Sequence, residues 1–120
     1  MTDVKFEFYR GDTYSRDFII RGYSSPIDKI FLTVKENAND KKYVLQKKLG
    51  NGITLVDEEE NAKTYNILIN ASDTDGLKTD YNYPFDIEIQ TNSDPVIKRT
   101  IVTGTLRLTT DITRPINEVM

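Results

Sequence analysis

Apolar and polar residues alternate along most of this chain. Near the start, Val4, Phe6 and Phe8 are separated by the charged residues Lys5 and Glu7. Side chains of a β-strand point alternately to its two faces, so this spacing predicts a strand with one buried face and one solvated face. Similar segments, bounded by turn residues, predict strands over residues 4–9, 14–21, 29–36, 42–48, 53–56, 63–70, 81–90 and 96–110.

The residue types agree with this pattern. The chain contains 13 Ile, 7 Val and 14 Thr but only 3 Ala, and β-branched residues favour the strand over the helix. Groups of turn residues recur about every ten positions, which is typical of a sandwich or barrel. We therefore predict an all-β fold: an antiparallel, immunoglobulin-like β-sandwich of about 7–9 strands over residues 1–111, with a C-terminal tail over residues 112–120.

Three local features refine this picture around the seventh predicted strand. Tyr81 or Tyr83 is expected to bond back to the preceding corner, as a tyrosine does in immunoglobulin-like sandwiches. Ser72 or Asp73 is expected to accept N–H bonds in a single helical turn, with Leu77 closing the core below it. Pro84 has no N–H for a ladder, so we expect it at a sheet edge or a bulge.

Composition removes most catalytic chemistry. The sequence has no His, Cys or Trp, so it has neither a Ser–His–Asp triad nor a thiol nucleophile, and no zinc site built from imidazole or thiolate. The sequence nominates no catalytic, cofactor-binding or metal-ligating residue. With 16 Lys and Arg against 19 Asp and Glu, the net charge of -3 argues against nucleic-acid binding, which needs a basic surface. No continuous apolar stretch opens the chain, so we expect neither a signal peptide nor a membrane anchor.

Three motifs have a local explanation. Asp73-Thr74-Asp75-Gly76 resembles part of a calcium loop, but Leu77 and Pro84 occupy ligand positions of that motif, so a turn is the better interpretation. Arg10-Gly11-Asp12 spells an integrin-recognition tripeptide, yet a tight reversal with Gly at positive φ explains it. The acidic run over residues 57–60 is expected to be a solvated bend rather than a cation site.

Aromatic residues without a core assignment are the candidate interface. Tyrosine and phenylalanine supply contact area at small entropic cost, so we rate a protein interface above a sugar-binding surface. Two apolar residues of the tail extend the set, because they are expected to lie along a partner. The candidate interface residues are Tyr9, Tyr14, Tyr23, Phe31, Tyr43, Ile116 and Val119.

Five segments of the sequence form a pattern by their order and spacing: Phe6-Glu7-Phe8-Tyr9-Arg10-Gly11-Asp12-Thr13, Leu32-Thr33-Val34-Lys35, Leu45-Gln46-Lys47-Lys48-Leu49, Asp73-Thr74-Asp75-Gly76-Leu77 and Tyr81 through Ile89. Together they resemble small proteins encoded in tailed phages and prophages of Gram-positive bacteria. The resemblance covers about residues 4–113, and the named proteins to which the chain is similar are the N-terminal β-sandwich domains of phage upper baseplate proteins. These residues define a fold pattern and no catalytic signature.

The resemblance implies a structural or assembly protein, located in the virion or in the host cytoplasm during assembly. Its expected partners are other virion or assembly proteins, and self-association through the tail is a further expectation. Neither nucleic acid nor a membrane is expected as a partner. A carbohydrate-binding or cell-surface-binding module is the second hypothesis, and a small hydrolase based on carboxylates is a distant third.

Overall fold

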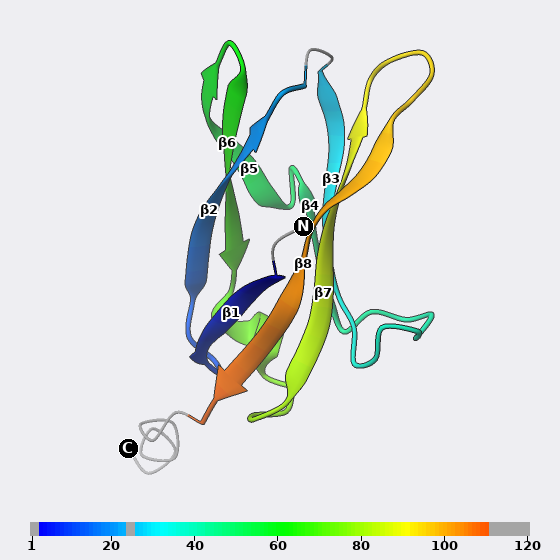
Figure 1. Cartoon of the computed structure of the whole chain (residues 1–120). Helices are drawn as coiled ribbons and strands as arrows, with labels where there is room; N and C mark the ends of the chain where they lie inside the picture. Colours follow the sequence, from blue (N-terminus) through cyan, green and yellow to red (C-terminus); the bar gives the residue numbers. More distant parts are fainter. Residues whose placement is uncertain (1–2, 24–25, 111–120) are drawn as a thin grey trace.

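The computed structural model describes residues 3–23 and 26–110 of the chain, and this part is almost entirely β-structure (Figure 1). Eight strands and one short 3₁₀ helix follow each other along the sequence, which confirms the all-β prediction and its number of strands. The elements are β1 (Asp3–Tyr9), β2 (Tyr14–Arg21), β3 (Ile27–Val34), β4 (Leu45–Leu49), β5 (Gly52–Glu59), β6 (Ala62–Ile69), η1 (Ala71–Thr74), β7 (Asn82–Thr91) and β8 (Lys98–Thr109).

All eight strands belong to one sheet in the order β1-β8-β7-β3-β4-β5-β6-β2. Most neighbours are antiparallel, but β1 runs parallel to β8 and β4 runs parallel to β5 at their short contact. The prediction of a purely antiparallel sheet is therefore wrong for these two pairs. The physical reason is topological: β1 and β8 are separated by the whole chain, so no hairpin constrains their relative direction.

The sheet curls until its two outermost strands, β1 and β2, approach each other. The Phe8 and Tyr14 rings stack across this junction with centroids 4.3 Å apart. The Arg16 guanidinium of β2 donates a hydrogen bond of 3.0 Å to the Lys5 carbonyl of β1 and lies 5.1 Å from the Phe6 ring centroid. We call this junction of β2 with β1 and β8 the seam; side-chain and side-chain-to-backbone contacts close it, without a ladder between β1 and β2.

The core occupies the space enclosed by the curled sheet. Alternate residues of each strand point into it, as the sequence pattern predicts. Burying one such side chain contributes about 1.5–3 kcal/mol. The buried hydrophobic residues are Phe6, Ile20, Ile30, Leu32, Val34, Leu45, Ile53, Tyr65, Ile67, Ile69, Tyr83, Phe85, Ile87, Ile89, Leu106 and Leu108.

One end of the molecule, which we call the η1 end, is closed by the short helix. The Asp73 carboxylate accepts the N–H of Asn70 at 2.7 Å, which confirms the expected cap. The same carboxylate pairs with Lys47 Nζ at 2.6 Å, and Lys47 points into the molecule from β4. Leu77 is partly buried against the core, as expected. The opposite end carries the β5–β6 and β7–β8 hairpins and is called the hairpin end (Figure 1).

The tyrosine corner is present at the η1 end. Tyr83 is only 1% exposed, and its hydroxyl accepts the backbone N–H of Lys78 at 2.8 Å. Tyr81 bonds in a different direction, because its hydroxyl donates to the Glu36 carbonyl at 2.7 Å. Both tyrosines thus hold a chain segment outside their own strand.

Two local predictions are corrected by the sheet order. Pro84 lies on β7, a central strand between β8 and β3, and the bulge in its pairing with β8 is elsewhere, at Ile101 of β8 opposite the step from Ile87 to Glu88. Its carbonyl accepts the N–H of Lys35, just past the end of β3. Because the N–H and C=O of one residue face the same neighbour, the missing N–H costs no bond to β8; the bond forgone is the one to Lys35, beyond the end of β3. The acidic run is solvated, as expected, but residues 57–59 belong to β5 rather than to a bend, and the turn begins at Glu60.

Candidate functional site

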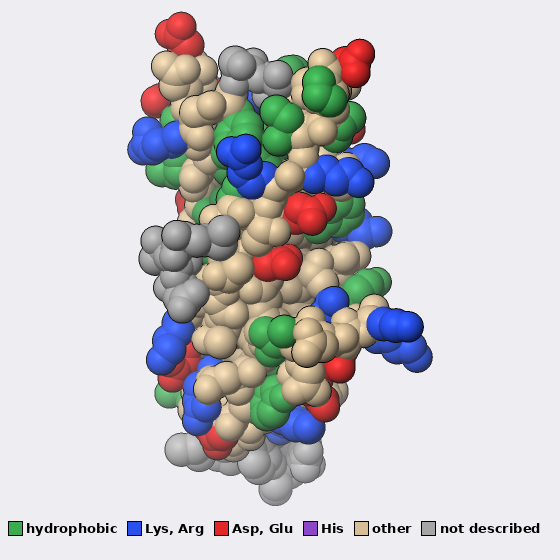
Figure 2. Space-filling view, turned by 45° about the vertical axis from the view of Figure 1, so that its right-hand side comes forward, with side chains coloured by type: hydrophobic (Ala, Val, Ile, Leu, Met, Phe, Trp, Pro, Cys, Tyr) green, Lys and Arg blue, Asp and Glu red, His purple; other side chains and the backbone are tan. Residues whose placement is uncertain are grey.

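A broad trough lies on the outer surface of β1, β8, β7 and β3, the surface that faces away from the core. Its volume is about 850 Å³, within the usual range of ligand and partner sites. The trough exists because the outward positions of these strands carry short side chains, including Thr33, Pro84, Thr103 and Thr105. In Figure 2, neutral polar side chains and backbone cover much of the middle of the visible face.

Gly104 brings β1 close enough to β8 to form one side of the trough. A Cβ built on Gly104 would lie 1.9 Å from the Val4 carbonyl oxygen and 2.9 Å from the Phe85 ring. Only a glycine therefore permits β1 to pair here while Phe85 packs beneath it. Thr103 and Thr105 flank this glycine in sequence, so their side chains point outward into the trough.

Four charged side chains line the trough: Lys5, Lys35, Asp86 and Glu88. The pKa of the Asp86 carboxyl is raised, chiefly because partial burial disfavours the charged form and secondly because Glu88 is negatively charged. Lys35 acts in the opposite direction and lowers it. The trough therefore offers a polar floor of mixed charge. Within residues 3–23 and 26–110, no three Asp or Glu side chains converge to hold a metal ion.

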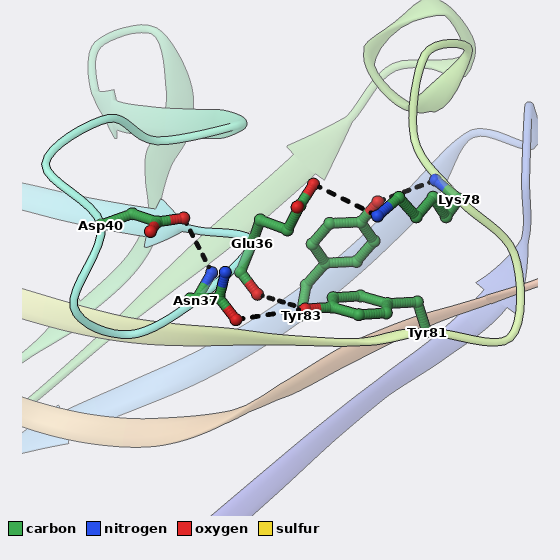
Figure 3. A network of polar contacts seen from close by, with 6 residues as sticks. All are labelled: Glu36, Asn37, Asp40, Lys78, Tyr81 and Tyr83. Atoms are coloured by element: carbon green, nitrogen blue, oxygen red, sulfur yellow. Dashed lines mark hydrogen bonds and ion pairs between the residues drawn. The ribbon is translucent and has the colours of Figure 1, made fainter.

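The loop between β3 and β4 stands beside the trough and is fixed by a polar network (Figure 3). The Tyr81 hydroxyl donates to the Glu36 carbonyl and lies 3.5 Å from Asn37 Oδ1. The Glu36 carboxylate pairs with Lys78 Nζ at 3.5 Å, and the Asp40 carboxylate accepts the Asn37 N–H at 3.0 Å. The network connects this loop to the segment that carries the tyrosine corner, so the loop has a defined shape.

This loop contributes Lys35 and Ala38 to the trough and also carries Tyr43, which is 54% exposed. Phe31 lies on the outer face of β3, opposite Glu88 of the trough. One predicted interface aromatic, Phe31, thus borders the trough, and a second, Tyr43, is carried by the adjoining loop.

The other predicted interface residues lie elsewhere. Tyr9, 51% exposed, is at the η1 end, and Tyr23 is partly buried just beyond β2 at the hairpin end. Tyr14 is half-buried in the seam, where it stacks on Phe8. Ile116 and Val119 of the tail lie outside the described residues. The structure does not bring the predicted set together on one surface.

The Arg10-Gly11-Asp12 turn is fastened to the η1 end. Gly11 has a φ of 85°, as expected for a tight reversal, and its N–H donates to Thr74 Oγ1 at 2.8 Å. The Arg10 guanidinium donates to the Leu77 carbonyl at 3.2 Å. The arginine is thereby held against the protein, which supports the local explanation of this tripeptide.

The trough residues were missed in the sequence because they are far apart along it. Thr33, Asp86 and Thr103 come from three strands and meet only through the pairings β3–β7 and β7–β8. The available signal was Gly104 between two threonines, since a glycine inside a strand marks a close backbone approach.

No family model matches this sequence, and no curated protein matches it either. The part of the chain that the structure describes contains no helix of the length and apolar character needed to cross a bilayer. The functional interpretation therefore depends on the geometry of the surface and on the resemblance in sequence.

Proposed function

We propose that this protein is a non-catalytic structural or assembly module, of the kind encoded by tailed phages and prophages, and that it binds another protein through the trough. The observation that carries the proposal is the trough itself with its fixed β3–β4 loop. A surface already held in shape loses less conformational freedom on binding, which favours affinity.

The composition of the trough favours a protein over a sugar as its ligand. Sugar-binding surfaces stack an exposed ring on the pyranose, whereas the ring lining this trough, Phe85, is only 5% exposed. Phe31 borders the trough and Tyr43 is exposed on the adjoining β3–β4 loop, so both rings are available to add contact area around the polar floor. Mixed charge on that floor, from Lys35 and Asp86, gives a protein partner complementary positions for register.

The experiment compares incorporation of variants into particles. The encoding strain is induced, particles are purified by density, and the chain is quantified by mass spectrometry in strains carrying either wild type or a variant. Thr105→Arg places a long cationic side chain in the trough. The matched control is Thr54→Arg, an exposed position on the outer face of β5.

Wild type and Thr54→Arg are expected in particles at one fixed stoichiometry, with Thr105→Arg reduced at least tenfold while its thermal unfolding is unchanged. Particles that lack the wild-type chain would contradict the assembly function. Normal incorporation of Thr105→Arg would contradict the role of the trough.

A further inference from the structure

The seam is open over the half nearest the hairpin end. On β8, only Thr103–Thr109 pair with β1, although the strand begins at Lys98. Residues 98–102 therefore have no strand on that side within the described part of the chain, and across the seam β2 pairs only with β6. In Figure 1, β1 lies between β2 and β8 over the lower half alone. Such an edge presents unpaired backbone N–H and C=O groups.

A small apolar hollow lies in the seam where β1 begins. Its volume is about 90 Å³, and the apolar side chains around it include Phe6, Phe18, Ile67 and Val102. Arg16 and Asp17 of β2 also line it. An apolar cavity of roughly 150 Å³ holds a benzene molecule, so this smaller hollow fits one aliphatic side chain.

Basic side chains flank the open half. Arg21 ends β2, and Lys98 and Arg99 begin β8; all three are exposed. Among the described residues, none of the three forms an ion pair with a carboxylate. In a chain whose net charge is -3, this group of cations favours an acidic ligand.

Exposed aliphatic side chains lie near the same cations. Ile19 is 51% exposed on β2, and Val96 and Ile97, at 54% and 38%, precede β8. Figure 2 shows hydrophobic and basic side chains interspersed at the hairpin end. Apolar contacts bordered by charge are the composition that a specific peptide site uses.

We propose that the open half of the seam binds an extended segment of a partner protein, which adds as a strand to residues 98–102 of β8. One aliphatic side chain of that segment enters the hollow, and acidic residues on both sides of it face Arg21, Lys98 and Arg99. This is β-augmentation: main-chain hydrogen bonds provide affinity, and a pocket for one side chain provides specificity. The site adjoins the trough, with which the hollow shares Val4, but it does not depend on the proposed function.

The shape of the seam argues for a single strand. The added segment continues the line of β1 along β8, where the backbone groups of residues 98–102 that do not face β7 are unpaired within the described chain, and it covers Val102 and Phe18 at the hollow. β8 has a bulge at Ile101, opposite the step from Ile87 to Glu88; the strand bends there, and the added segment must follow that bend.

The probe is a synthetic peptide, acetyl-Asp-Asp-Thr-Val-Ile-Val-Thr-Asp-Asp-amide, used with the full chain. Two matched peptides replace either the central isoleucine by alanine or all four aspartates by lysines. Binding is measured by fluorescence anisotropy of a labelled peptide, and its position by amide hydrogen exchange of the labelled protein. We expect the acidic peptide to bind at least tenfold more tightly than either matched peptide, with new protection at residues 98–102.

Charge reversal tests the same site from the protein side. The double variant Lys98→Glu, Arg99→Glu is expected to weaken the acidic peptide at least tenfold and to prefer the lysine peptide. Lys48→Glu, an exposed lysine on the outer face of β4, is the control and should leave binding unchanged. Thr105→Arg in the trough should also leave it unchanged, so failure here is distinguishable from failure of the proposed function.

Four results would overturn the proposal. The first is no binding of the acidic peptide at millimolar concentration. The second is protection that falls outside residues 98–102. The third is self-association that protects these amides without peptide, which would assign the edge to a second copy of the chain. The fourth is protection in the monomer that disappears when residues 1–2 are deleted, which would assign the edge to the chain's own first residues.

Discussion

The two halves of the seam are bordered by the same strands, β2 and β8, yet they are built differently. Toward the η1 end, β1 pairs with seven residues of β8, and the Phe8 and Tyr14 rings stack across the junction. Toward the hairpin end, residues 98–102 pair with β7 but have no strand on their seam side within the described chain, and Ile19 is 51% exposed.

The two halves differ in how much of β8 is covered. Within the described residues β1 has 7 residues whereas β8 has 12, so part of the β8 edge has no described strand on its seam side. The closed half contributes buried rings and main-chain bonds to stability. The open half leaves the same kinds of group available to a partner. One half of the seam thus closes the sheet, and the other half is the proposed binding site.

The largest effect is expected from breaking the closed half at Gly104. In Gly104→Ala the new methyl group meets the Val4 carbonyl and the Phe85 ring, so β1 must move away from β8. We expect a loss of about 3 kcal/mol in the free energy of unfolding, at the upper end of overpacking costs. Urea unfolding followed by circular dichroism measures it.

Gly76→Ala is the matched control for this substitution. No atom lies within 4 Å of a Cβ at Gly76, so the same chemical change should alter stability by no more than about 0.5 kcal/mol. Equal effects of the two substitutions would contradict the close approach of β1 to β8.

The second test asks whether rings hold the closed half together. Tyr14→Ala removes the ring that stacks on Phe8 and whose centroid lies 5.6 Å from that of the Phe6 ring. Because Tyr14 is half-buried, we expect the free energy of unfolding to fall by about 2 kcal/mol, less than the roughly 3–5 kcal/mol lost with a fully buried ring. Tyr9→Ala, at a 51% exposed ring, should change stability by less than about 0.5 kcal/mol. If Tyr9→Ala lowers the thermal unfolding temperature more than Tyr14→Ala does, the stacked rings do not hold the seam together.

The third test concerns the polar contacts of the η1 end. Tyr83→Phe leaves the Lys78 N–H without its acceptor and should cost about 1 kcal/mol, the usual net value of one hydrogen bond. Tyr43→Phe is the control because Tyr43 is exposed. If chemical denaturation gives the same midpoint for both variants, the tyrosine corner does not stabilise the fold.

Much of the strand pattern was predictable because it is local. The alternation predicts a strand over residues 14–21, and β2 has the same bounds. The fourth strand was predicted to begin at residue 42 but begins at Leu45. The loop before it is held at its start, where Glu36 and Asn37 bond to Tyr81, 45 and 44 residues further along the sequence. A contact between residues so distant in sequence cannot be predicted from the local alternation of apolar and polar residues.

The surfaces were less predictable than the strands. Parallel pairing of β1 with β8 joins the two ends of the described chain, and it depends on Gly104, which resembles an ordinary strand position in the sequence. The trough and the open half of the seam both follow from that one pairing. Aromatic residues were predicted to form an interface, but Tyr14 instead stacks on Phe8 inside the seam. Exposure depends on sheet order, which residue type does not determine.

The smallest change in stability is expected at Asp86, near the point where the closed and open halves of the seam meet. Asp86 lies opposite Thr103, the residue of β8 at which pairing with β1 begins. Burial, reinforced by Glu88, raises the pKa of its carboxyl in the folded state, so the folded protein binds this proton more tightly than the unfolded chain does. Ionised Asp86 therefore destabilises the fold at neutral pH, and the penalty disappears as the pH falls through the folded pKa toward the unfolded value of about 3.9.

Asp86→Asn should consequently stabilise the protein at pH 7, by no more than about 0.5 kcal/mol because the group is only partly buried. At pH 3 the carboxyl is protonated in both states, so wild type and variant should unfold at the same urea concentration. Glu88→Gln removes the second cause and should give a smaller gain of the same sign. A gain that does not depend on pH would mean that shape rather than charge distinguishes the two side chains. A loss at pH 7 would show that ionised Asp86 stabilises the sheet at this level, contrary to the direction of its pKa.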